Sequence, residues 1–168
     1  MGASMKSVVA ALVGAVGLCL AGGAQAQSFY FVQLSDSGMF VAERDSIRWR
    51  DNRPQIDVHV VYRTPLAFEK VSGSGYDWVQ RAIMRYEFDC TQPRARVVSF
   101  RFMTFAGTQS GSDGEPSPWD TYEVDSPNAA VREMACKNTL PTDITFNSIA
   151  DAAYVYYEVE NEDDEAEE

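Results

Sequence analysis

Residues 81–90 alternate between two classes of side chain more regularly than any other part of this sequence. One phase holds Ala82, Met84, Tyr86, Phe88 and Cys90, and the other holds Ile83, Arg85, Glu87 and Asp89. Because successive side chains of a β-strand point to opposite faces of a sheet, this period of two predicts a strand with one dry face and one wet face. The dry face must be buried against a second layer, which is the strongest constraint that the sequence places on its fold.

The same period recurs in residues 55–62 and 96–105. In the first of these stretches the predicted dry face holds Ile56, Val58, Val60 and Tyr62, and the predicted wet face holds Asp57, His59, Val61 and Arg63. Residues 29–34 and 39–43 flank a turn of small residues, which predicts a hairpin. Together these stretches predict an antiparallel sheet of about five to six strands in a meander, within an α+β fold.

Three connecting segments have the composition of turns or loops. We expect a turn at residues 51–54 and the end of a strand at Thr64-Pro65. Residues 107–118 are rich in glycine, proline and serine, and this composition predicts a mobile surface loop.

Ser126-Pro127 marks the start of the clearest helix. A serine at the N-cap and a proline at the first helical position favour a helix over residues 128–137. Lys137 suits the negative end of the helix dipole. The apolar stripe of this helix consists of Ala130, Val131, Met134 and Ala135.

The C-terminal part of the chain is less clear. Residues 148–157 fit two structures equally well, because Ser148 and Asp151 favour the start of a helix whereas the run from Tyr154 to Tyr157 also suits a strand. Residues 158–168 include eight acidic residues among 11. A block of like charge repels itself and has too little apolar surface to fold, so we expect a disordered acidic tail.

The first 26 residues have the pattern of a secretory signal peptide. Lys6 precedes an apolar run of 13 residues, and Ala24-Gln25-Ala26 suits cleavage after Ala26. As a helix this run would span about 20 Å, which is less than the roughly 30 Å of a bilayer core. We therefore expect a protein that is exported to the periplasm, the cell surface or the medium.

Cleavage after Ala26 removes Cys19 and leaves Cys90 and Cys136 in an oxidising compartment, where we predict that they form a disulfide. The alternative is a nucleophilic cysteine with a histidine base, which would require the pair to stay reduced. Because Cys90 lies on the predicted dry face and Cys136 near the end of the predicted helix, a disulfide would hold the helix against that face.

The composition indicates one folded domain and argues against nucleic acid and anionic lipid as partners. The 168 residues are 45% hydrophobic, which is enough for one folded domain, expected over residues 27–157. The formal net charge of −11 argues against binding to nucleic acid phosphates or to anionic lipid. After the signal peptide, no stretch of the sequence is long and apolar enough to cross a bilayer.

The sequence carries no motif for a catalytic centre, a metal or a cofactor. His59 is the only histidine, and zinc sites need more cysteine or histidine ligands than remain. Asp113 and Glu115 supply too few oxygen ligands for calcium. Two alternative functions stay open: a periplasmic hydrolase that uses carboxylates such as Asp57 and Glu87, and an envelope assembly or stress factor.

The densest basic and aromatic segment of the chain consists of Arg44, Arg48, Trp49, Arg50 and Arg53. Arginine and tryptophan are enriched at the hot spots of protein interfaces, so Arg48, Trp49, Arg50 and Arg53 form a candidate binding surface. The average burial of tryptophan instead favours a solvated strand in which Trp49 is buried.

The hairpin at residues 29–43, the strands at 81–90 and 96–105, and the segment from Trp119 through Ser126-Pro127 to Cys136 resemble the surface-adhesin protein E family of Gram-negative bacteria. The resemblance covers residues 29–137. It implies an antiparallel sheet that carries a helix tethered by a disulfide.

The same resemblance implies attachment to a protein partner, either an envelope protein or a host extracellular protein such as vitronectin or laminin. It also implies that a homodimer can form. The sequence departs from the family pattern in two places. Cys19 follows Leu18 inside the apolar run, unlike the acylated cysteine of a lipoprotein signal, and the acidic segment 158–168 is an addition.

Overall fold

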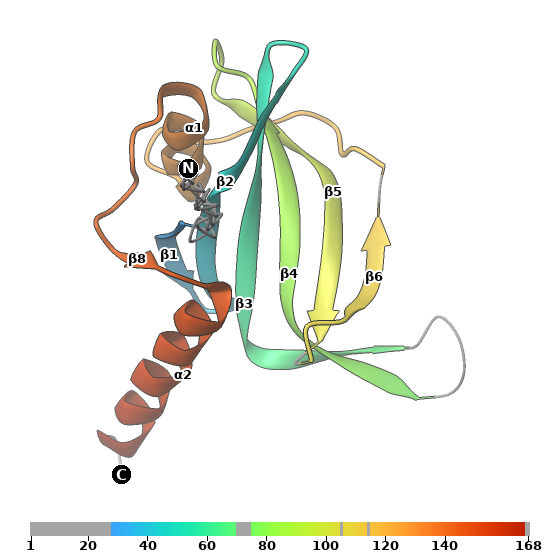
Figure 1. The fold of residues 1–168 in the computed structure, drawn as a ribbon, viewed down its shortest axis with the longest axis vertical. Coiled ribbons are helices and arrows are strands. Elements are labelled where there is room, and N and C mark those ends of the chain that lie inside the picture. Colours follow the sequence, from blue (N-terminus) through green and yellow to red (C-terminus); the bar gives the residue numbers. More distant parts are fainter. Residues whose placement is uncertain (1–27, 70–74, 105, 114, 167–168) are drawn as a thin grey trace, which may run out of the picture.

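The computed structural model describes residues 28–69, 75–104, 106–113 and 115–166. The predicted signal peptide and its cleavage site lie outside these residues. The described chain forms one sheet and two helices (Figure 1). The elements are β1 (Phe29–Ser35), β2 (Gly38–Arg50), β3 (Arg53–Glu69), β4 (Tyr76–Phe88), β5 (Arg94–Thr104), β6 (Gln109–Asp113), β7 (Asp120–Thr121), α1 (Pro127–Lys137), β8 (Thr145–Phe146) and α2 (Ile149–Ala166).

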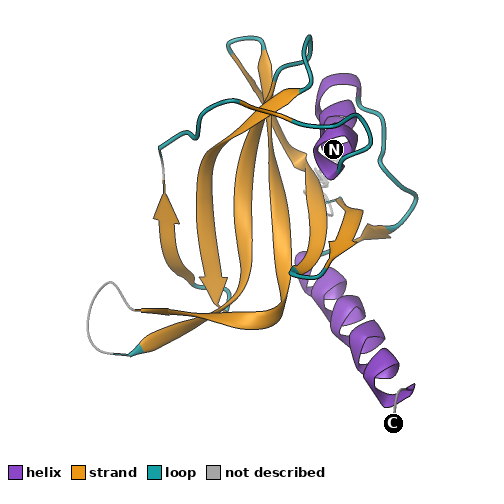
Figure 2. Cartoon of the chain, turned by 180° about the vertical axis from the view of Figure 1, so that it is seen from behind, coloured by secondary structure: helices purple, strands orange, loops and turns teal. Residues whose placement is uncertain are grey.

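The strands lie in the order β6-β5-β4-β3-β2-β1-β8, and β7 pairs with β5. Strands β1 to β6 follow one another as an antiparallel meander, which confirms the predicted α+β fold. Two short strands, β7 and β8, extend the sheet beyond the five or six strands that were expected. The sheet curls into a half-barrel, as both views of the chain show (Figures 1 and 2).

The turn between β1 and β2 requires a glycine. Gly38 pairs with Ser35 across the hairpin and with Tyr62 on β3. A Cβ atom at Gly38 would lie 2.1 Å from the carbonyl oxygen of Val61, so any side chain would push β3 away. The small-residue turn in the sequence therefore serves the packing of three strands.

Two connections differ from the sequence-based expectation. β3 does not end at Thr64-Pro65 but continues to Glu69, with a register shift between Val61 and Leu66 that removes the proline from regular pairing. Part of the expected loop 107–118 is the strand β6, which pairs with β5. An edge strand is held by main-chain hydrogen bonds to one neighbour, so its side-chain composition did not reveal it.

Helix α1 begins and ends as the sequence predicted. The hydroxyl of Ser126 accepts a hydrogen bond from the Ala129 N–H, and Asn138 closes the helix in the left-handed conformation with φ of 58°. The buried residues Val131, Met134 and Ala135 pack on one face of the sheet. The sheet residues beneath them, which define the α1 face, are Tyr30, Ala42, Ile56, Val58, Phe88 and Ala95.

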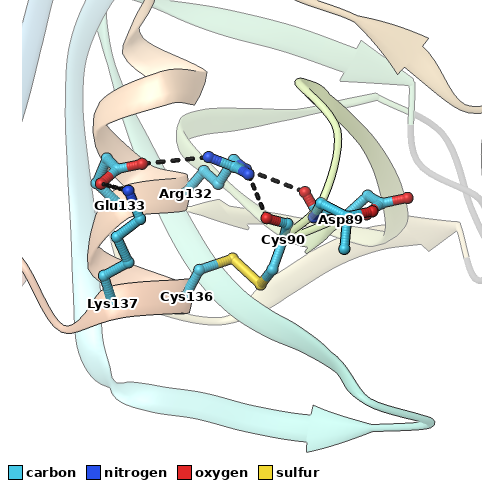
Figure 3. The surroundings of a disulfide bond; sticks show 7 residues. Asp89, Cys90, Arg132, Glu133, Cys136 and Lys137 are labelled. Atoms are coloured by element: carbon cyan, nitrogen blue, oxygen red, sulfur yellow. Dashed lines mark hydrogen bonds and ion pairs between the residues drawn. A yellow bond between two sulfur atoms is a disulfide. The ribbon is translucent and has the colours of Figure 1, made fainter.

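A disulfide joins Cys90, which follows β4, to Cys136 in the last turn of α1, with 5.8 Å between the Cα atoms. Figure 3 shows that Arg132 reaches the same connection from the helix, where its guanidinium donates to the carbonyl oxygens of Asp89 and Cys90. The helix is thus fixed by a covalent bond and by two hydrogen bonds to one turn. This arrangement confirms the predicted layer order.

Helix α2 packs on the opposite face of the sheet. Ser148 accepts a hydrogen bond from the Asp151 N–H, so the first turn has the cap that favoured a helix over a strand. Ala152 and Tyr156 are buried against Val41 and Val61. From that contact the helix leaves the sheet and extends away from its lower end (Figures 1 and 2).

The backbone of α2 remains helical as far as Ala166, whereas the charge of residues 158–168 predicted a disordered tail. The Tyr154 hydroxyl donates a hydrogen bond to Glu158 one turn later. Alanine and glutamate are good helix formers, and a helix that is already packed at Ala152 needs no new nucleus to continue. Local propensity thus offsets part of the charge repulsion in this segment.

Candidate protein-binding site

The end of the β2–β3 hairpin positions the residues that the sequence proposed for binding. Asp51 and Asn52 form its two-residue turn with positive φ values of 49° and 61°. Both residue types tolerate this conformation, and such turns match the twist of paired strands. The turn places Arg50 opposite Arg53 at the tip of the hairpin. We call Arg48, Trp49, Arg50 and Arg53 the tip surface.

Trp49 is 58% exposed, so the expectation of a buried tryptophan is wrong. Trp49 lies beside the turn, at the end of the hairpin. Strand β2 also has a bulge before it: Glu43 pairs with Asp57 and Arg48 with Gln55, which leaves residues 44–47 opposite Ile56 alone. The bulge resets the alternation of side chains, so residues beyond it do not follow the phase of residues 39–43. Arg48 and Arg50 are exposed beside Trp49.

The bulge is itself stabilised by a buried serine. The Ser46 hydroxyl donates to the Glu43 carbonyl at 2.6 Å and accepts from the Asp57 N–H at 2.7 Å. Without Ser46, this main-chain N–H would be buried with no acceptor, which is costly. The register that places the tip surface is therefore stabilised by a residue that sequence reasoning did not single out.

The tip surface borders a cavity of about 590 Å³ that also reaches β4 and β5. Its polar lining brings together side chains from three strands and from the segment that follows β6. The lining residues are Arg48, Trp49, Arg50, Asp51, Arg53, Gln55, Arg85, Glu87, Arg96, Val98, Ser99 and Pro116. All four residues proposed for binding therefore lie at one cavity.

The cavity lies on the face opposite α1, where β3, β4 and β5 carry paired charges. Both oxygens of Asp57 accept from Arg85, at 2.7 and 2.6 Å, and Arg101 reaches the same carboxylate at 3.3 Å from β5. Glu87 accepts from Arg96 at 2.8 Å and from the Gln55 amide at 2.8 Å. We call this part of the sheet the charged face.

His59 continues the charged face toward α2. Its Nε2 lies 2.9 Å from a carboxylate oxygen of Glu43, and Arg81 approaches Nδ1 at 3.2 Å. Since a guanidinium can only donate, Nδ1 accepts and Nε2 carries the proton donated to Glu43. Burial lowers the pKa of Arg81, and the charge of Glu43 opposes that shift.

The expectation of a wet face is wrong for these residues. Asp57, His59 and Glu87 are 4%, 3% and 4% exposed. The polar alternation was identified correctly, but the side chains are buried because the curled sheet brings opposite charges from neighbouring strands into contact. The hydrogen bond from Arg85 to Asp57 raises the pKa of Arg85, the sign of a tightly held ion pair.

Trp119 lies at the centre of a group of arginines near the cavity. The guanidinium carbons of Arg53, Arg94 and Arg96 lie 5.2, 5.1 and 4.8 Å from the centre of its ring. Arginine stacks favourably on an indole face, so Trp119 holds three cations together that would otherwise repel one another. The sequence pattern indicates no role for Trp119 beyond its place in the family resemblance.

Sequence reasoning did not assign Gln55, Arg96 or Ser99 to the site. They lie on different strands, and only the observed register places them at one cavity, with Gln55 opposite Glu87 and Glu87 opposite Arg96.

Among the residues that the structure describes, no three His, Cys, Asp or Glu side chains are arranged to hold a metal ion. In the same part of the chain, no helix is long and apolar enough to cross a membrane.

A family model described as surface-adhesin protein E matches residues 30–137, which is more than half of the 168 residues. The matched span runs from β1 through α1 and includes both cysteines and the tip surface, whereas α2 lies beyond it. No curated protein and no solved structure matches the chain. With the disulfide-tethered helix in place on its antiparallel sheet, the chain belongs to the surface-adhesin protein E family.

Proposed function

We propose that this protein is exported and non-enzymatic, and that it binds an extracellular or envelope protein through the tip surface. Its family supports an adhesin-like role. The observation that carries the choice of surface is the exposure of Trp49, which is 58% exposed next to Arg48 and Arg50 in the chain and lines a cavity. Tryptophan and arginine are enriched among the few residues that carry most of the binding energy in protein interfaces.

The export of the protein is supported by the disulfide between Cys90 and Cys136, because such bonds persist outside the reducing cytosol. We propose that the signal peptide is cleaved after Ala26 and that the protein then resides in the periplasm or at the cell surface. Sequencing the mature N-terminus after cell fractionation tests the cleavage and the location together.

The arrangement of the charged face supports a structural rather than a catalytic role for its carboxylates. Arg85 occupies both oxygens of Asp57, and Arg96 and Gln55 occupy those of Glu87. A general acid or base needs an oxygen within reach of a substrate. A hydrolase screen with Asp57→Asn and Glu87→Gln variants tests this: activity abolished by either substitution in a folded protein would favour the hydrolase alternative.

Capture of partners from envelope extract and from host matrix proteins tests the proposed surface. We expect Trp49→Ala to abolish retention of a partner that the unchanged protein retains. Trp78 on β4 is a matched control, because it is also 58% exposed and pairs with Ala67 in the part of the β3–β4 hairpin beyond the register shift. Loss of binding in Trp78→Ala but not in Trp49→Ala would contradict the proposed surface.

A further inference from the structure

We propose that the cavity beside the tip surface binds carboxylate side chains of an acidic segment in the partner protein. This inference rests on the proposed function and specifies the chemistry of the partner. Arg48 and Arg50 supply the guanidinium groups that bind the carboxylates, and Trp49, which lies between them in the chain, lines the same cavity.

The charge of the cavity lining supports an anionic ligand. Five of the lining residues are arginines, and only Asp51 and Glu87 carry a negative charge. The chain as a whole has a formal net charge of −11. A local positive surplus on a negatively charged protein orients an acidic partner, since the remaining surface repels it.

Three of the five arginines already have partners inside the fold. Arg85 is bound to Asp57 and Arg96 to Glu87, and Arg53 lies over the ring of Trp119. Arg48 and Arg50 have no hydrogen bond or ion pair within the described part of the chain, and both are exposed. The Arg53 side chain also makes no hydrogen bond there, but its guanidinium is held over Trp119. Arg48 and Arg50 are therefore the exposed guanidinium groups of the lining that have no partner in the described part of the fold and whose donors are available to a ligand.

The residue types present favour carboxylates of a peptide over the sulfate groups of a glycan. A guanidinium binds a carboxylate through two parallel hydrogen bonds. Trp49, Val98 and Pro116 place apolar surface beside the charges. Each acidic side chain of a peptide offers an apolar stem that ends in a carboxylate, whereas a sulfated glycan offers sulfate groups on a polar sugar.

The occupied arginines make the site rigid. Arg85 and Arg96 are fixed in the cavity lining by their carboxylates, and Gln55 is fixed by Glu87. A ligand that reaches these residues meets side chains that are already ordered, which lowers the entropic cost of binding. Only Arg48 and Arg50 would have to be ordered by the ligand.

Fluorescence anisotropy with a labelled octaglutamate peptide and the purified exported protein tests this inference. We expect binding that weakens when salt is raised from about 50 mM to about 500 mM, because exposed charges are screened. The combined substitution Arg48→Gln and Arg50→Gln should weaken binding about 10-fold or more, as expected for the loss of charge-assisted hydrogen bonds. Thermal unfolding should be unchanged, since neither side chain has a partner in the fold.

Three controls locate the effect. Lys137→Gln removes an exposed cation from α1 and should leave peptide binding within about twofold. Arg48→Lys with Arg50→Lys keeps the charge but not the paired hydrogen bonds, and should recover only part of the affinity. An octaglutamine peptide of the same length should not bind.

Several outcomes would overturn the inference. They are equal peptide binding by the unchanged protein and the double glutamine variant, absence of peptide binding, or binding of a heparin oligosaccharide without binding of the peptide. The proposed function is judged separately by partner capture. If Trp49→Ala abolishes capture while the double glutamine variant retains it, the tip surface stands and the acidic partner is rejected.

Discussion

The two faces of the sheet are built from the same strands but are buried in different ways. On the α1 face, Ile56, Val58 and Phe88 are covered by the apolar side of a helix. On the charged face, Asp57 and Glu87 are equally buried but lie against arginines of neighbouring strands rather than against a helix. Burial by itself therefore does not distinguish an apolar core from a polar one.

The two faces differ in how a substitution lowers the free energy of unfolding. Apolar burial depends on contact area, so its loss scales with the atoms removed. An ion pair that is withdrawn from water depends on both members, and removing one leaves the other charge buried without compensation. The α1 face should therefore depend on its covering helix, and the charged face on each of its pairs.

The largest expected loss of stability follows from removing the disulfide that holds α1 on the sheet. Replacing Cys90 and Cys136 by serine releases the constraint on a sequence separation of 46 residues, which should lower the free energy of unfolding by about 4 kcal/mol. Urea unfolding of the oxidised protein and of this variant measures the loss. Reducing agent should destabilise the unchanged protein and leave the variant unaffected. Equal unfolding midpoints for all samples would show that the disulfide does not stabilise the protein.

On the charged face, Asp57→Asn should lower the free energy of unfolding by about 2 to 3 kcal/mol. This value is below that of fully buried pairs because Arg85 and Arg101 have side chains that are 19% and 41% exposed. Adding Arg85→Met should restore part of the loss by removing the uncompensated cation. Asp36→Asn in the exposed β1–β2 turn is the control. If Asp57→Asn lowers the free energy of unfolding no more than Asp36→Asn does, the ion pair contributes little to stability.

Acidification should act on the connection that holds α1. Hydrogen bonds from the Thr91 hydroxyl and N–H, together with the Arg94 guanidinium, keep the pKa of Asp89 below its ordinary value of 3.8. A lowered pKa in the folded state stabilises the protein above that ordinary value, and the contribution disappears as the pH falls below it.

Asp89→Asn should therefore cost about 1 to 2 kcal/mol at neutral pH, and this cost should shrink below about pH 4. Unfolding of both proteins across this pH range measures the difference. A cost that stays constant down to the lowest pH would show that the ionised form of Asp89 is not the stabilising one.

The smallest effect on stability is expected at the tip surface. Trp49→Ala should change the free energy of unfolding by less than about 0.5 kcal/mol, because most of the side chain is in solvent. The same substitution should abolish partner capture. A large loss of stability would instead place Trp49 among the residues that support the fold.

Short-range chemistry made several features predictable. The alternation at residues 81–90 identified β4, and Ser126-Pro127 fixed the start of α1. The cysteine count and the expected export identified the disulfide. These features depend on neighbouring residues or on the chemistry of one residue type, so no knowledge of distant contacts was required.

The errors came from residues whose surroundings are set by other strands. Pro65 was expected to end a strand that instead continues past an irregularity, and Trp49 was expected to be buried. The charge of residues 158–168 did not reveal that α2 would continue through most of them. For Pro65 and Trp49, the position in the paired strands altered the outcome that local composition favoured, whereas residues 158–166 continue a helix that has already formed.

By itself, the sequence determined that an antiparallel sheet carries a helix tethered by a disulfide, since periodicity, capping and cysteine chemistry are local. Only the tertiary structure decided that Asp57, His59 and Glu87 are buried and that Trp49 is exposed. Burial of a charge depends on whether a counter-charge lies on the next strand, which is set by register. The face on which each residue of the tip surface lies depends on a bulge that shifts the phase of β2. Both are properties of strand pairing, which cannot be read from the alternation of residues along one strand.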